Sequence, residues 1–168
     1  MKSLSEIETV AKRSSRAAGF SWGVAEEVGK NIRMLEFFGI KGIKNLNYYF
    51  RVRAKKNFEK LSLINNKNKT AKLELCPIIA GLNFLDQIRS LEGFGEILFE
   101  KIAYPILFLP FVSRASEVIG KKLELKIDNK IFLLSYNSCI YSNSLIDGVI
   151  EIGNNISIKF QDNKDSFK

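Results

Sequence analysis

Residues 3–39 carry the feature that most constrains the fold, because they contain two amphipathic helical patterns joined almost without a linker. Ser3 followed by Glu6 has the spacing of a capping box, and apolar or small residues then recur at helical spacing up to Gly19, a typical stop signal. Ser21 is a plausible cap for a second apolar stripe that runs to the end of the segment. The pattern predicts a helical hairpin with a very short connection.

The middle of the chain predicts two more helices around a polar loop. Gly42 interrupts the chain, and residues 43–54 have the apolar spacing of a third helix. The polar run at 65–69 is the best candidate for a linker. Pro77 can open a further helix over 78–91, since proline is favoured at the first helical position.

The segment that follows is predicted to change from strand to helix. Residues 97–109 are rich in β-forming side chains, but Pro105 restricts them to an edge strand or to two pieces. Pro110 can open another helix, which Gly120 would close.

The C-terminal third has the pattern of strands. Apolar and charged residues alternate over 123–127, and an Asp-Asn turn leads into residues 131–134, which predicts a hairpin. Residues 149–152 and 156–160 predict a second hairpin, with its turn at 153–155.

Together these elements predict an α+β fold, in which the N-terminal helical hairpin and the third helix pack on an antiparallel-rich sheet from residues 97–160. The length suits a single domain over 1–168. A finer division would separate a helical lobe (1–64) from a mixed lobe (71–160), with a frayed tail (161–168).

The residue types exclude several kinds of chemistry. The sequence contains no histidine, which removes the commonest general base and the commonest transition-metal ligand. Its two cysteines, Cys76 and Cys139, belong to no CxxC pair, and the acidic residues have no spacing of a catalytic pair or a calcium loop. We therefore expect no metal, no cofactor and no catalytic residues. An enzyme with Glu26 or Glu27 as a base is a further alternative, but it lacks a second component.

The same sequence features predict a cytoplasmic protein. Unpaired cysteines suit a reducing compartment, and the polar N-terminus lacks the apolar core of a secretory signal. The most apolar run, residues 102–112, contains two prolines and is too short to span a bilayer.

The segment Gly19–Glu27 is the most unusual local sequence and is our main candidate for a binding site. A helix N-terminus carries free N–H groups and binds anions, so the backbone at Ser21 and Gly23 could hold an anionic group. The predicted roles of the other candidates are a stacking wall for Trp22 and orienting polar contacts for Glu26 and Arg33. The expected partner is a small anionic metabolite or another protein.

A purely structural explanation of this segment is also open. Trp22 would then cover the end of the hairpin, Glu26 would pair with Lys30, and the glycines would allow close helix packing.

The positive charge of the chain is concentrated in one segment. Residues 41–72 carry ten lysines and arginines against one acid, Glu59, whereas the whole chain has a net charge of +8. The side chains of Arg51, Arg53, Lys55 and Lys56 lie among aromatic residues, a composition typical of nucleic-acid surfaces. Nucleic-acid binding is therefore the alternative function, and a solvated basic helix and loop is the structural explanation.

Residues 3–42, which include the segment Gly-Phe-Ser-Trp-Gly-Val-Ala-Glu-Glu, resemble the start of DUF3726, a family of bacterial proteins of unknown function. The resemblance is looser over 75–81 and 105–111, and is absent from 43–70 and the C-terminal hairpins. The family implies no established activity.

Overall fold

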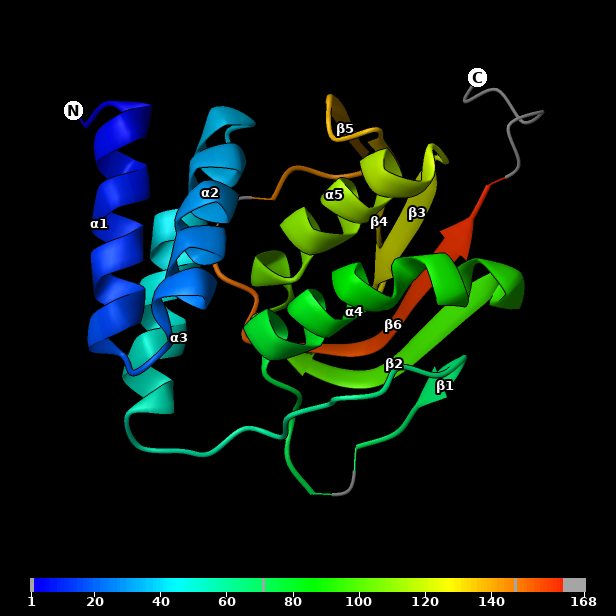
Figure 1. Cartoon of the computed structure of the whole chain (residues 1–168), viewed down its shortest axis with the longest axis horizontal. Coiled ribbons are helices and arrows are strands. Elements are labelled where there is room, and N and C mark those ends of the chain that lie inside the picture. The colour runs from blue at the N-terminus through cyan, green and yellow to red at the C-terminus, as the bar shows by residue number, and fades with distance from the viewer. Residues whose placement is uncertain (1, 71, 147, 162–168) are drawn as a thin grey trace.

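The computed structural model of the chain describes residues 2–70, 72–146 and 148–161 (Figure 1). The helices are α1 (Leu4–Ala17), α2 (Trp22–Phe37), α3 (Gly42–Arg53), α4 (Pro77–Leu91) and α5 (Leu109–Ile119), with short 3₁₀ turns η1 (Glu92–Phe94) and η2 (Pro105–Leu107). The strands are β1 (Lys67–Asn68), β2 (Glu96–Ala103), β3 (Leu123–Ile127), β4 (Lys130–Ser135), β5 (Cys139–Ser142) and β6 (Ile152–Phe160).

The strands form one sheet in the order β1-β2-β6-β3-β4-β5. Each neighbouring pair is antiparallel except β1 and β2, which are parallel. Helices α4 and α5 cover one face of the sheet, while α1, α2 and α3 stand beside this layer and contact it through α5 and η2 (Figure 1). The predicted α+β class is confirmed.

The predicted helical hairpin is confirmed together with its caps. The Ser3 hydroxyl accepts a hydrogen bond from the Glu6 N–H at 3.2 Å, and the Ser21 hydroxyl accepts one from the Val24 N–H at 3.3 Å. Gly19 has a φ of +101°, a backbone conformation that side chains disfavour, so a glycine permits the tight connection. A Cβ at Gly29 would lie 2.8 Å from the Glu8 carbonyl oxygen. Because α1 and α2 approach each other so closely at this point, α2 has a glycine there.

The predicted second hairpin is wrong, because residues 152–160 form one continuous strand. β6 pairs with β3 over 156–160, and its ladder with β2 runs from Ile152 to Lys159, through the Gly-Asn-Asn segment. Asn155 has a φ of +58°. The buried position before Asn155 is Gly153, and the buried positions after it are Ile156 and Ile158. The polar turn signal therefore marks a local bend, at which the inward-facing positions shift by one residue.

The segment at 65–69, predicted as a polar loop and the best linker candidate, is loop except at 67–68, where it is fastened to the sheet. Lys67 and Asn68 form β1, alongside Leu98 and Phe99 of β2. Asn68 is buried, and its amide donates to the carbonyl oxygens of Asn65 at 2.8 Å and Leu98 at 3.0 Å. A polar side chain thus supplies anchoring that a hydrophobic pattern cannot reveal.

The β-rich segment predicted at 97–109 stops before Pro105, and its second part is a 3₁₀ turn and the start of a helix, not a strand. β2 ends at Ala103 and η2 begins at Pro105, after which α5 runs to the left-handed cap at Gly120. Of the tail that was predicted to fray, Gln161 donates its backbone N–H to the Lys122 carbonyl oxygen at 3.1 Å, and 162–168 lie outside the described residues.

The buried apolar side chains form one cluster that runs from Ile7 in α1 to Ile158 in β6. Within it, α4 and α5 pack closely because Gly81 faces the ring of Phe111. A Cβ at Gly81 would lie only 2.1 Å from Phe111 Cδ2, and Phe111 is fully buried. The helical layer over the sheet therefore depends on the absence of a side chain at Gly81.

We predict that Gly81→Ala lowers the free energy of unfolding by about 1–3 kcal/mol, because a fully buried ring must move to admit a methyl group. Urea denaturation followed by circular dichroism measures this change. Gly23→Ala is the matched control, since nothing lies within 4 Å of a Cβ there. If the free energy of unfolding of Gly81→Ala equals or exceeds that of the wild type, the packing of Gly81 against Phe111 is contradicted.

Candidate functional site

A cavity of about 540 Å³ lies where the end of α1, the start of α2, the end of α3 and the start of α4 meet. The segment that leads away from α3 closes one side of it. Its lining consists of Ala17, Ala18, Gly19, Phe20, Ser21, Val24, Tyr49, Phe50, Arg53, Ala54, Lys56, Asn57, Phe58, Lys60, Cys76 and Ile79.

Arg53 fixes the end of α3 against the connection between α1 and α2. Its Nη1 donates a short hydrogen bond to the carbonyl oxygen of Ala18, and its guanidinium lies over the ring of Phe20, 4.1 Å from the ring centre. Arg16 donates in turn to the Phe20 carbonyl oxygen at 2.9 Å. The guanidinium of Arg53 is thereby held in one orientation.

The cavity is positively charged. Arg53, Lys56 and Lys60 line it, and none of its lining residues is Asp or Glu. Lys56 Nζ pairs with the carboxylate of Glu74, which lies outside the lining, at 2.7 Å. The other two cations of the lining, Arg53 and Lys60, face no acidic residue within it. Burial opposes ionisation of Glu74, yet the hydrogen bond from Lys56 and the nearby Lys101 keep the pKa of that carboxyl below its ordinary value.

One wall of the cavity is aromatic. The ring centres of Phe20 and Phe50 are 6.2 Å apart, those of Tyr49 and Phe50 are 5.8 Å apart, and those of Tyr49 and Phe58 are 5.3 Å apart. Rings at these spacings offer an apolar surface on which a planar group can stack. Cations and aromatic faces therefore meet in the same hollow.

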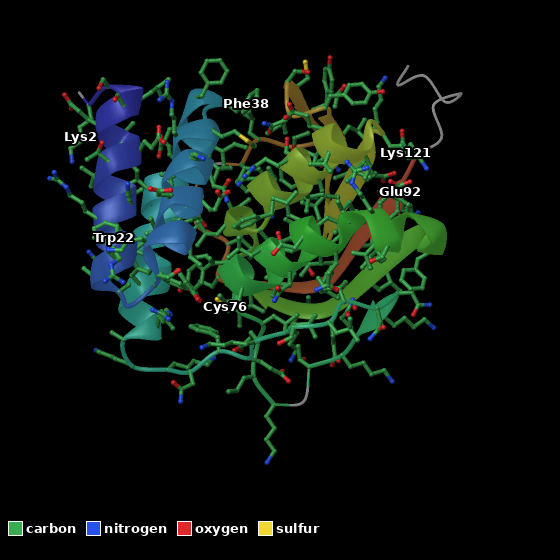
Figure 2. All side chains as sticks on the ribbon, in the orientation of Figure 1. Lys2, Trp22, Phe38, Cys76, Glu92 and Lys121 are labelled. Carbon is green, nitrogen blue, oxygen red and sulfur yellow. The ribbon has the colours of Figure 1, made fainter. Side chains whose placement is uncertain are left out.

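Tyr49 and Cys76 join the floor of the cavity to the core. The Tyr49 hydroxyl lies 2.8 Å from Cys76 Sγ, and both side chains are buried. Burial, together with the neighbouring thiol, raises the pKa of Tyr49 far above its ordinary value, so the phenol stays neutral at physiological pH. Figure 2 shows Cys76 at the base of α4, on the side that faces α3.

Helix ends add to the electrostatics of the cavity. The N-terminal turns of α2 and α4 contribute positive partial charge through Ser21 and Ile79. The C-terminal turn of α1 contributes carbonyl groups, but Arg53 occupies the Ala18 oxygen and Arg16 the Phe20 oxygen. The C-terminal end of α3 also borders the cavity, so the positive character of the site comes from its arginine and lysine side chains and not from the helix ends.

Of the five residues predicted around the start of α2, only Ser21 lines the cavity. Trp22 is 59% exposed and lies against α1, with Arg16 at 4.8 Å and Lys12 at 5.7 Å from the ring centre (Figure 2). Gly23 is exposed on the same outer side. The structure therefore separates the indole from the hollow near it.

Glu26 and Arg33 connect α2 to α1 on the outer surface. Glu26 pairs with Lys12 at 3.1 Å, and Arg33 pairs with Glu8 at 3.0 Å. The pairing of Glu26 with Lys30 is not observed, since Lys30 instead lies 3.9 Å from Glu27. Both side chains thus have structural partners outside the cavity.

The four cations of the nucleic-acid alternative are divided between two surfaces. Arg53 and Lys56 line the cavity, whereas Arg51 lies over the Tyr48 ring at 5.7 Å and Lys55 is exposed. The two sites predicted from sequence therefore meet at one place, where Ser21 and Arg53 line the same hollow.

The sequence reasoning did not join the aromatic wall and the floor to the start of α2 in one site. Phe20, Phe58, Lys60 and Cys76 were not among the predicted site residues, although the basic segment that contains Phe58 and Lys60 was singled out. The available signal was the mixture of rings and cations after α3, which does not indicate that these side chains face the turn between α1 and α2.

The fold and the cavity define an α+β protein with a cationic, aromatic-lined hollow formed mostly by its N-terminal helices. Residues 2–75 match the model of the family described as Protein of unknown function (DUF3726), which confirms the predicted resemblance. The match includes 43–70, where no resemblance was predicted, but it ends at residue 75 and so leaves out 76–81 and 105–111, where a looser resemblance was predicted. No curated protein and no solved structure shows a detectable match to the chain.

Two general features of the chain can be stated for the part that the structure describes. Across 2–70, 72–146 and 148–161, no helix has the length and apolar character needed to cross a membrane. The same residues contain no group of three or more acidic or cysteine side chains placed to hold a metal ion.

We predict that alkaline pH destabilises the protein partly through Tyr49. Its folded pKa lies above the ordinary value of about 10, so its contribution to stability is complete below that pH and is lost as pH rises further. The free energy of unfolding should therefore fall above pH 10 more steeply in the wild type than in Tyr49→Phe, by up to about 1.4 kcal/mol per pH unit.

Urea denaturation at a series of alkaline pH values measures both slopes. Tyr141→Phe is the matched control because Tyr141 is exposed, and it should retain the wild-type slope. Identical slopes for the wild type and Tyr49→Phe would contradict the buried, neutral phenol.

Proposed function

We propose that the protein is a non-catalytic binding protein for a small organic anion with a planar apolar part. The single observation that carries this proposal is the guanidinium of Arg53, held over the Phe20 ring in a cavity whose lining includes cations but no acid. The anionic group would lie between Arg53 and Lys60, and the planar part against Phe50 and Phe58.

The dimensions and composition of the cavity support this proposal. Its volume of about 540 Å³ lies in the range of pockets that enclose small metabolites. Arginine recognises carboxylate and phosphate groups through directed hydrogen bonds, and a fixed guanidinium loses little freedom on binding. Ser21 stays in the proposal as a polar group at the cavity, whereas Trp22, Gly23, Glu26 and Arg33 have no direct role in it.

We predict that the cavity binds 8-anilinonaphthalene-1-sulfonate, a probe with an anionic group on an aromatic body. Its fluorescence should rise on binding, and Arg53→Gln should weaken the affinity about tenfold or more, because a charge-assisted hydrogen bond contributes about 1.5–3 kcal/mol. Arg51→Gln is the matched control, since Arg51 is on the same helix but faces outward over Tyr48.

Arg53 also anchors the turn between α1 and α2, so circular dichroism must show that Arg53→Gln is folded. Lys60→Gln provides a second test, because Lys60 lines the cavity and lies in the segment after α3. Trp22→Ala should leave the affinity almost unchanged. If Arg51→Gln weakens binding as much as Arg53→Gln and Lys60→Gln do, the probe binds elsewhere and the proposed site is refuted.

The nucleic-acid alternative predicts a different dependence on the same side chains. Retention on heparin or single-stranded DNA should fall steeply with salt, and neutralising Arg51, Arg53, Lys55 and Lys56 together should abolish it. Retention that depends on Arg51 and Lys55, while the affinity for the sulfonate probe does not, would favour nucleic-acid binding over the cavity. If no anionic compound stabilises the protein in a thermal screen, a partner protein becomes the better explanation.

A further inference from the structure

The charges around the cavity leave a surplus of two cations. Lys56 Nζ pairs with the Glu74 carboxylate at 2.7 Å, so these two charges compensate each other. Arg53 and Lys60 line the cavity, and within the part of the chain that the structure describes neither forms an ion pair with a carboxylate. Because binding sites and their ligands carry complementary charge, the cavity matches a ligand group with two negative charges.

The hydrogen-bonding groups at the turn between α1 and α2 favour the same kind of ligand. Arg53 already donates to the Ala18 carbonyl oxygen, and Arg16 donates to the Phe20 carbonyl oxygen at 2.9 Å. The Ser21 hydroxyl accepts a backbone N–H of α2 at 3.3 Å, and its own proton has no acceptor among the described residues. That hydroxyl can therefore donate to a ligand. This side of the cavity offers donors and cations, so it suits a group whose oxygens accept and carry no proton.

The aromatic wall lies directly beside these cations. The Arg53 guanidinium is 4.1 Å from the centre of the Phe20 ring, and Lys56 Nζ is 5.6 Å from the centre of the Phe58 ring. Both rings line the cavity. A planar group stacked on this wall has a cation within reach, so the charged group of the ligand is attached to it directly or through a short linker.

We infer, on the basis of the proposed function, that the ligand is a phosphate monoester of a planar compound and that its phosphate binds as a dianion between Arg53 and Lys60. A phosphate monoester has a second pKa of about 6, so it carries close to two negative charges at neutral pH, and its terminal oxygens accept hydrogen bonds. Arginine and lysine are the side chains that proteins commonly use to bind phosphate. A carboxylate or a sulfonate has a single charge and would leave one of the two cations uncompensated.

The ionisation of the ligand, and not that of the site, governs how this preference depends on pH. The titratable side chains in the lining are Tyr49, Arg53, Lys56, Lys60 and Cys76, and Glu59 and Glu74 lie next to it. The chain contains no histidine, the side chain whose ordinary pKa is closest to that of a phosphate monoester. Burial opposes the ionisation of Glu74, yet its hydrogen bond from Lys56 keeps the pKa of that carboxyl below its ordinary value, so this pair persists in mild acid.

Isothermal titration with 1-naphthyl phosphate and 1-naphthalenesulfonate tests this proposal, because the two compounds share one ring system and differ in charge. We expect the phosphate to bind about tenfold more tightly than the sulfonate at about pH 7.5, since it makes one more charge-assisted contact. The preference should largely disappear at about pH 5, where the phosphate, like the sulfonate, carries about one negative charge.

Substitutions at the charges should change this preference in opposite directions. Lys60→Gln should remove most of it, whereas Lys55→Gln is the matched control, because Lys55 is exposed in the same segment but does not line the cavity. Glu74→Gln should increase the preference, since it leaves Lys56 as a third uncompensated cation.

The outcomes separate this proposal from the proposed function. If the two naphthyl compounds bind equally at about pH 7.5, while 8-anilinonaphthalene-1-sulfonate still binds through Arg53, the phosphate assignment is overturned and the binding function stands. If neither naphthyl compound nor the fluorescent probe binds, the proposed function fails and the assignment fails with it. A preference that survives Lys60→Gln but is lost in Lys55→Gln would place the phosphate outside the cavity and refute the assignment.

Discussion

The buried ring of Tyr49 is the contact on which both the fold and the cavity depend. It packs on Phe50 and Phe58 beside it, on Tyr104 at the end of β2, and its hydroxyl meets the Cys76 thiol at the start of α4. One side chain thus joins α3 to the start of α4 and to the end of β2. Because the ring is wholly buried and its hydroxyl has a partner, its position is fixed without an unsatisfied polar group.

A second connection lies between α2 and α5, where Arg114 pairs with Glu27 and donates to the Asn31 side chain at 3.3 Å. These two polar contacts orient the helical hairpin relative to the sheet layer, while apolar burial supplies most of the stabilisation. The cavity beside Tyr49 remains open because helices end around it. Four helix ends cannot interdigitate as helix faces do, and the space is bordered by polar backbone groups and long cations.

The sequence predicted the elements governed by local rules. Serine caps, the glycine at 19 and the prolines at 77 and 110 placed the helix starts and stops to within about one residue, because each acts within a few residues. The prediction failed for segments whose conformation depends on the strands that pair with them. The Gly-Asn-Asn segment at 153–155 resembles a turn, yet the ladder with β2 runs through it, and the polar run at 65–69 is fastened by the amide of Asn68.

The same distinction explains the candidate site. Sequence reasoning identified Ser21 and Arg53 separately. They line the same cavity only because the end of α3 packs against the turn between α1 and α2. The segment matched by the family model supplies every lining residue except Cys76 and Ile79, which belong to the start of α4. The family segment therefore carries the cations and rings of the cavity, but the chain that follows it closes the floor. A fragment confined to 2–75 would lose the Cys76 contact of Tyr49 and expose that ring, so the cavity is a property of the larger fold.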